Sequence, residues 1–198
     1  MNDKTLTRTD EVTKGYYNEL VTFFKASKEG AENEQPQDGQ AHNLVHDTVS
    51  FYDTALSVLQ SISGERFGDP TVGQKLNDGF SKAVANVSGV FSGLGDHDDS
   101  KTIRDLYAAL NAGSCGLQML YATEVSGYGK STYSAQLLSL ANDMHNLVMK
   151  YNQTIPRVVV KELNREEDGA FSPALSSEIV SDLQDTWDKS SGTYQKVA

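Results

Sequence analysis

The sequence predicts an all-α protein, a mostly antiparallel bundle of five or six helices in a single domain of 198 residues. Apolar side chains return at every third or fourth position along most of the chain, which is the helical period. Gly, Pro and acidic residues gather between these periodic segments. One Cys excludes a disulfide framework. A chain of this length buries roughly 70% of the surface that its unfolded form exposes, so one core suffices.

The first predicted helix follows the candidate caps Thr9 and Asp10 and extends for about five turns to Gly30. Its apolar row consists of Val12, Tyr16, Leu20 and Phe23. The next segment, 29–40, contains one Pro, two Gly and no large apolar side chain. Such a composition predicts a flexible linker after the first helix.

The second predicted helix, 41–63, has apolar residues over roughly half of its circumference, so it should contact at least two neighbours. The third predicted helix, 71–94, contains several glycines. Each glycine inside a helix costs about 1 kcal/mol relative to Ala, which favours close packing against another backbone as the reason for them.

The fourth predicted helix, 100–125, is apolar on two sides. Its second, smaller row includes Cys115, which we predict to be a buried thiol because no basic residue near it in sequence would lower its pKa. The run Asp96 to Ser100 alternates carboxylates like a calcium loop, but Lys101 and Tyr107 replace the required Gly and Glu. We predict that these carboxylates cap the fourth helix.

The fifth predicted helix has the most regular heptad pattern and should end before Pro156. Its apolar row consists of Tyr133, Leu137, Leu140, Met144, Leu147 and Tyr151. An irregular connection is expected over 156–171, within which 157–163 is compatible with either a strand or a helix. The last helix should begin at the cap Ser172 with Pro173 in its first turn.

The segment 124–131 ends in Gly129, Lys130 and Ser131, which match the end of the phosphate-binding pattern G-x-x-x-x-G-K-[ST]. Glu124 occupies the first glycine position, where its carboxylate would face the phosphates. The preceding residues are also predicted to be helical where a strand is required. We therefore interpret this segment as a turn between helices, with a cofactor site at these three residues as the alternative, and we predict no cofactor.

His42 and His46 are spaced i, i+4, so their rings could chelate a divalent metal ion. Asp53 follows the same row but lies about 10 Å beyond His46 along the helix axis. A third ligand would have to come from another helix, so we predict two solvent-facing histidines and keep a metal site as the alternative. His145 lies beside an apolar row and is predicted to be partly buried.

The formal net charge of -10 opposes binding to nucleic acid or to an anionic membrane. No apolar stretch reaches the roughly 20 residues of a transmembrane helix, and the first residues carry no apolar leader. We expect a cytoplasmic location, with export by a leaderless route or association with a virion as alternatives.

No spacing typical of a catalytic site emerges from the sequence. We expect a non-enzymatic interaction or assembly protein of microbial or phage type, acting through apolar helix faces in self-association or in binding a protein partner. One alternative is a helical ligand- or metal-binding domain that uses His42 and His46. A second alternative is an acidic, inhibitor-like protein that docks on a basic partner.

Overall fold

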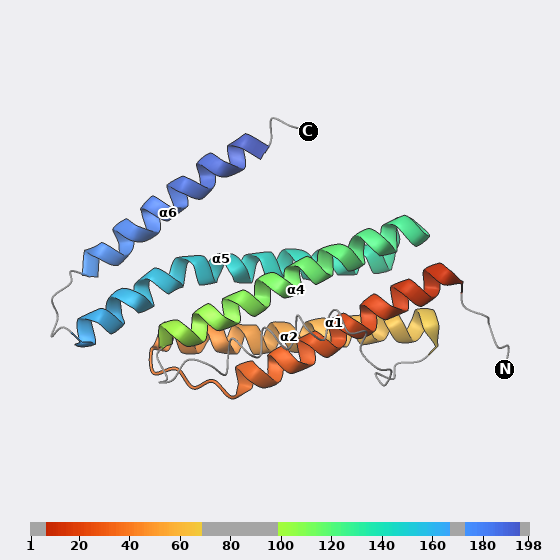
Figure 1. Cartoon of the computed structure of the whole chain (residues 1–198), viewed down its shortest axis with the longest axis horizontal. Coiled ribbons are helices and arrows are strands. Elements are labelled where there is room, and N and C mark those ends of the chain that lie inside the picture. Colours follow the sequence, from red (N-terminus) through yellow and green to blue (C-terminus); the bar gives the residue numbers. More distant parts are fainter. Residues whose placement is uncertain (1–6, 69–98, 167–172, 195–198) are drawn as a thin grey trace.

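The computed structural model describes residues 7–68, 99–166 and 173–194, and all five elements in these ranges are α-helices. Four of them pack side by side, namely α1 (Arg8–Glu32), α2 (Gly39–Phe67), α4 (Asp99–Tyr128) and α5 (Thr132–Glu166). α6 (Pro173–Tyr194) packs mainly on α5, outside this group (Figure 1). The predicted all-α fold is confirmed. The predicted third helix, 71–94, lies outside the described residues.

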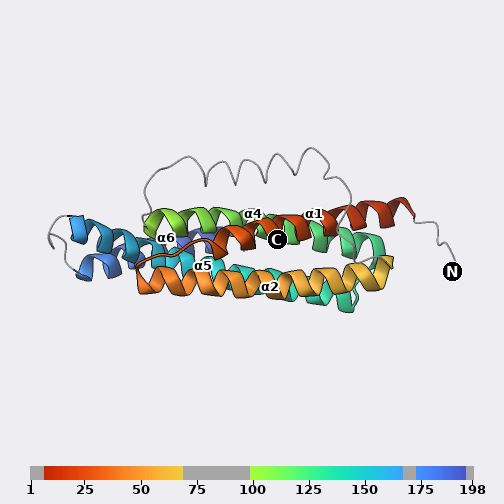
Figure 2. The same cartoon turned by 90° about the horizontal axis from the view of Figure 1, so that it is seen from below.

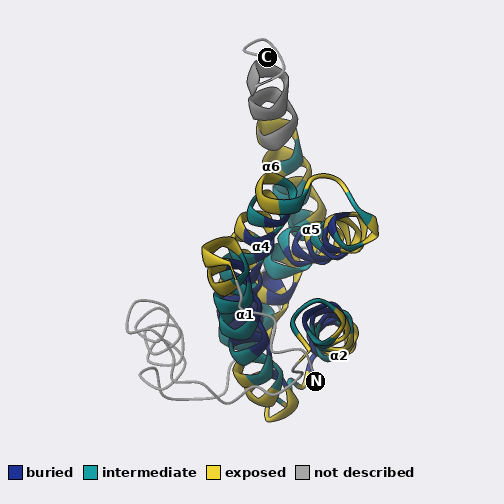
Figure 3. Ribbon diagram, turned by 90° about the vertical axis from the view of Figure 1, so that its right-hand side faces the viewer, coloured by how far each residue is buried: buried dark blue, intermediate teal, exposed yellow. Residues whose placement is uncertain are grey.

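The four packed helices run in two opposite directions. α2 and α4 run one way, and α1 and α5 run the other way (Figure 2). The buried apolar residues of the four helices form one hydrophobic core, and Figure 3 marks the buried residues in dark blue along the ribbons. Phe24 of α1 lies in this core, with its ring centroid 5.3 Å from that of Tyr52 and 6.1 Å from that of Phe51. None of the described helices is long and apolar enough to span a membrane.

The start of α1 is fixed by a capping box. The Thr7 hydroxyl accepts a hydrogen bond from the backbone N–H of Asp10, and the Asp10 carboxylate accepts one from the backbone N–H of Thr7. The cap is therefore Thr7, and the prediction of Thr9 was two residues late. Asp10 belongs to the cap as its third helical residue.

The connection after α1 is shorter than the predicted linker 29–40. α1 continues to Glu32 and α2 begins at Gly39, so only residues 33–38 lie between the two helices. α2 is capped by Asp38, whose side chain accepts hydrogen bonds from the backbone N–H groups of Gln40 and Ala41. At its other end α2 stops at Gly68, whose φ of 73° lies in the left-handed region that glycine adopts without strain.

α5 continues through Pro156 to Glu166, so the predicted helix end and the irregular connection over 156–166 were wrong. The segment 157–163 is helical. A proline inside a helix removes one hydrogen bond and costs about 3 kcal/mol. Contacts beyond the proline offset this cost, because Val158 belongs to the core and Lys161 and Arg165 bind carboxylates of other helices.

α5 buries apolar side chains on two opposite faces. Tyr151 and Val158 lie in the core of the four-helix group, whereas Val160 is buried outside that core. Nine residues separate Tyr151 from Val160, which at about 100° per residue places them about 180° apart around the helix. α6 packs on α5. We therefore assign the second apolar face of α5 to the contact with α6.

α4 approaches α1 through small residues. A Cβ atom at Gly113 would lie 2.7 Å from Cε1 of Phe24, and one at Gly116 would lie 2.8 Å from Cδ1 of Leu20. Cys115 is on the other side of α4 and is exposed, so the prediction of a buried thiol was wrong. The two glycines mark the face of α4 that packs on α1, and Cys115 lies about 100–200° around the helix from them.

Because α4 approaches α1 closely at Gly113, replacing glycine by alanine should destabilise the protein at Gly113 of α4 but not at Gly15 of α1. Gly113→Ala should lower the free energy of unfolding by about 1–3 kcal/mol relative to Gly15→Ala, because the new methyl group overpacks the core against Phe24. Gly15→Ala is the matched control, since nothing lies within 4 Å of its Cβ position and both changes gain the same helix propensity. Urea unfolding of both variants measures the difference. Equal stability would contradict the described packing of α1 on α4.

Candidate functional site

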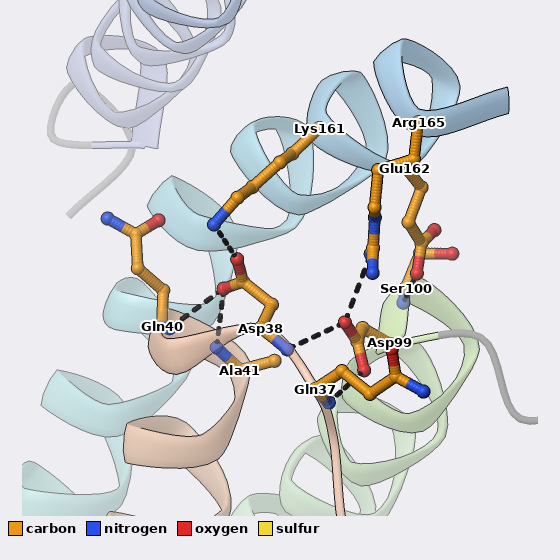
Figure 4. Close-up of polar contacts among 9 residues, drawn as sticks. All are labelled: Gln37, Asp38, Gln40, Ala41, Asp99, Ser100, Lys161, Glu162 and Arg165. Atoms are coloured by element: carbon orange, nitrogen blue, oxygen red, sulfur yellow. Dashed lines mark hydrogen bonds and ion pairs between the residues drawn. The ribbon is translucent and has the colours of Figure 1, made fainter. Parts of the chain in front are cut away.

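One end of the bundle holds a polar cluster that we call the acidic clamp, consisting of Asp38, Asp99, Lys161, Glu162 and Arg165. It joins the start of α2, the start of α4 and the last turns of α5 (Figure 4). Asp38 and Asp99 are 4% and 3% exposed, so both carboxylates are almost removed from water. Buried carboxylates require hydrogen-bond and charge partners, and the geometry shows which partners these have.

Asp99 binds the connection between α1 and α2. Its Oδ1 atom accepts a hydrogen bond from the backbone N–H of Gln37 at 2.7 Å, and its Oδ2 atom accepts one from that of Asp38 at 2.8 Å. Arg165 donates to the same Oδ2 atom at 3.2 Å. Within the run predicted to cap the fourth helix, Asp99 lies in the first turn of α4. Its described hydrogen bonds nevertheless go to another connection and to α5.

Asp38 links α2 to α5. One carboxylate oxygen caps α2, and the other accepts a hydrogen bond from the Lys161 ammonium group. Burial raises the pKa of Asp38, but Lys161 and the two cap N–H groups together lower it more, so its pKa lies below the ordinary value. The carboxylate is therefore held in its ionised form.

Glu162 completes the clamp by accepting a hydrogen bond from the backbone N–H of Ser100 at 2.8 Å. Every oxygen of Asp38 and Asp99 thus accepts a hydrogen bond from a backbone N–H or a cation. Over the described residues, no three His, Cys, Asp or Glu side chains come together in a group that could hold a metal ion. The clamp is a structural joint between three helices.

The opposite end of the bundle holds a second cluster, the arginine cluster, around Arg66 at the end of α2. Arg66 forms an ion pair with Glu124 of α4, whose side chain is fully buried. Its guanidinium group also lies 3.9 Å from the ring centroid of Tyr128 and 4.8 Å from that of Tyr133. Burial raises the pKa of Glu124, and the charge of Arg66 offsets part of this rise. The cluster joins α2 to the turn between α4 and α5.

Two further hydrogen bonds extend the arginine cluster. The Tyr128 hydroxyl donates to Asp10 of α1 at 2.6 Å, and the Tyr133 hydroxyl donates to Glu65 of α2 at 3.1 Å. Tyr17 of α1 is fully buried in the same region. Burial and the negative charge of Glu124 both raise the pKa of Tyr17. These contacts therefore join all four packed helices at this end, whereas the acidic clamp joins three.

The residues with a phosphate-loop pattern form a turn. Gly129 has a φ of 77° at the end of α4, Lys130 is exposed, and Ser131 exchanges hydrogen bonds with Ser134 at the start of α5. α4 precedes this turn where a phosphate-binding loop requires a strand. Glu124, at the first glycine position, belongs to the arginine cluster.

The predicted metal candidates all lie on the exposed side of α2. His42 and His46 are both exposed on α2, and Asp53 binds Lys28 at 2.9 Å. His145 is exposed on α5, so its predicted partial burial was wrong. His145 follows Leu138 by seven residues, so these two exposed side chains share one face of α5.

Exposed apolar side chains lie on α5 and α6, and we call them the α5–α6 surface. They are Leu138, Val159 and Leu163 of α5, which are 45%, 37% and 40% exposed, and Leu183 of α6, which is 38% exposed. Leu138 and Leu163 are 25 residues apart, which at about 100° per residue places them on nearly the same side of α5. Pro156 lies on this face as well, 18 residues after Leu138. Figure 1 shows α6 diverging from α5 along its length. α6 therefore covers only part of this face.

Asp99→Asn should lower the free energy of unfolding by about 2 kcal/mol, because an amide cannot accept all three hydrogen bonds of the carboxylate and loses the charge paired with Arg165. Asp143→Asn is the control, because Asp143 is exposed on α5 and should change stability by less than about 0.5 kcal/mol. Urea unfolding at neutral pH measures both. A similar, small effect of the two substitutions would show that the acidic clamp does not hold the helices together.

A scan against protein-family models, a search of curated proteins and a search of solved structures each found no match to the chain.

Proposed function

We propose that this chain is a non-enzymatic protein-binding module whose α5–α6 surface receives a helix of a partner protein. The observation that carries the proposal is the position of α6, which packs mainly on one helix and leaves apolar side chains exposed on itself and on that helix. A helix normally covers its apolar row against the core. Here Leu183 of α6 and Leu138 of α5 are still available for another apolar surface.

The geometry of helix packing supports a helical partner. α6 begins beside the end of α5 and then diverges from it (Figure 1). Leu175 and Ile179 precede Leu183 at four-residue spacing and are half-buried, so exposure increases along the row as α6 leaves α5. Covering exposed apolar area contributes roughly 25 cal/mol per Å². An amphipathic helix that lies along this row would cover it continuously.

Charge favours a different protein over a second copy of this chain. The chain has a formal net charge of -10, so two copies repel each other. A non-enzymatic role is supported by the structural use of the buried ionisable groups. Asp38, Asp99 and Glu124 are each engaged with cations or backbone N–H groups that join helices.

Two double variants test the proposal. Leu138→Asp with Leu183→Asp places charges on the α5–α6 surface, and Val12→Asp with Met119→Asp is the control, because those side chains are 48% and 47% exposed on α1 and α4. A partner is captured from the source organism with the tagged full chain, purified, and titrated by calorimetry. We expect the α5–α6 variant to weaken binding at least about tenfold, while the control binds like the unmodified chain.

Two outcomes would overturn the proposal. In one, both double variants bind the purified partner equally well, which would place its binding elsewhere. In the other, light scattering shows a dimer of the unmodified chain that Leu138→Asp with Leu183→Asp dissociates, which would make a second copy the occupant. Circular dichroism confirms that the variants remain helical.

A further inference from the structure

Resting on the proposed function, we infer that the partner helix is basic, with Lys or Arg side chains beside its apolar row. The α5–α6 surface alone would accept any apolar helix. The chemistry of the partner is instead indicated by a row of carboxylates on α6 that borders the apolar row. Three steps lead from the positions of these carboxylates to the charge of the partner.

The first step is the alignment of the carboxylates. Glu178, Asp182 and Asp185 follow one another at spacings of four and three residues, so they share one face of α6. All three are exposed. The segment 174–186 contains no Lys or Arg. Between residues 174 and 186 the charged residues on this face of α6 are therefore all negative, and the first cation in the sequence of α6 is Lys189, four residues after Asp185.

The second step is the position of this row beside the apolar row. At about 100° per residue, the centre of the acidic row lies about 90° around α6 from the centre of the row formed by Leu175, Ile179 and Leu183. Asp182 lies only about 20° from Leu175. A helix that covers the apolar row consequently passes along the carboxylates.

The third step is that none of the three carboxylates has a cation partner among the described residues. Lys161 and Arg165 of α5 are engaged by Asp38 and Asp99 in the acidic clamp. A neutral or acidic helix would remove water from the carboxylates without replacing its hydrogen bonds, which costs binding energy. A basic helix supplies both hydrogen bonds and opposite charge.

Two synthetic amphipathic peptides test this inference. They share one row of Leu residues, and one carries Lys where the other carries Glu. Fluorescence anisotropy at about 0.15 M salt, where the Debye length is about 8 Å, measures the binding of each peptide to the full chain. We expect the Lys peptide to bind at least about tenfold more tightly than the Glu peptide.

Local recognition is separated from attraction to an acidic protein by two variants. Leu138→Asp with Leu183→Asp adds two negative charges, taking the formal net charge from -10 to -12. It should nevertheless bind the Lys peptide more weakly, because the apolar row is lost. Replacing Glu178, Asp182 and Asp185 by Lys removes three negative charges and adds three positive ones, which takes the formal net charge from -10 to -4. This variant should nevertheless prefer the Glu peptide.

The control for charge reversal carries Glu11→Lys, Glu29→Lys and Asp143→Lys, three exposed positions outside α6. This control variant has the same formal net charge as the variant with three Lys residues on α6, and it should still prefer the Lys peptide.

The outcomes distinguish this inference from the proposed function. Equal affinity for the two peptides, lost in Leu138→Asp with Leu183→Asp, would overturn the basic partner and leave the apolar docking surface in place. Binding that does not respond to the two Leu substitutions would overturn the proposed function itself. A preference for the Lys peptide that survives charge reversal on α6 would also overturn the inference, because the attraction would then follow net charge.

Discussion

The two-sided packing of α5 is the constraint on which the rest of the arrangement depends. One face, through Tyr151 and Val158, completes the core with α1, α2 and α4, and the opposite face, through Val160, is buried outside that core. Both buried faces continue beyond Pro156, through Val158 and Val160, so α5 must remain helical where its local sequence favours a break. If α5 ended at the proline, the bundle would lose its contacts to the starts of α2 and α4, and α6 would lose its support.

Polar clusters fasten the two ends of the four-helix group, while apolar packing fills its middle. The acidic clamp holds the α1–α2 connection, α4 and α5 together, and the arginine cluster joins α2 to α4 and to the start of α5. In the acidic clamp, cations and backbone N–H groups satisfy the buried carboxylates of Asp38 and Asp99. In the arginine cluster, Arg66 pairs with one carboxylate oxygen of Glu124, while Glu124 Oε2 and Arg66 Nε are buried without a hydrogen-bond partner among the described residues. Neither cluster includes a residue of α6. This difference separates the four-helix group from the helix that we propose to present a binding surface.

Apolar periodicity was sufficient to predict the fold class and the core face of the fifth helix, where Leu137, Leu140 and Met144 are all buried. It could not predict the continuation through Pro156 or the short connection before α2, because both depend on contacts such as Asp99 with Asp38, 61 residues apart in sequence. Cys115 and His145 were misplaced because rows of moderate apolarity do not reveal which face a neighbour covers. The row of carboxylates on α6 was present in the sequence, but its meaning depends on α6 lying outside the four-helix group.

Native-state hydrogen exchange of the full chain tests the division between the four-helix group and α6 most directly. We predict that amides of α6 between residues 177 and 186 open with a free energy at least about 2 kcal/mol below that of α5 amides between 144 and 158, because α6 packs mainly on one helix. The α5 amides should stay protected while α6 opens. A single opening free energy shared by both segments would contradict the account, since it would make α6 an integral part of the core.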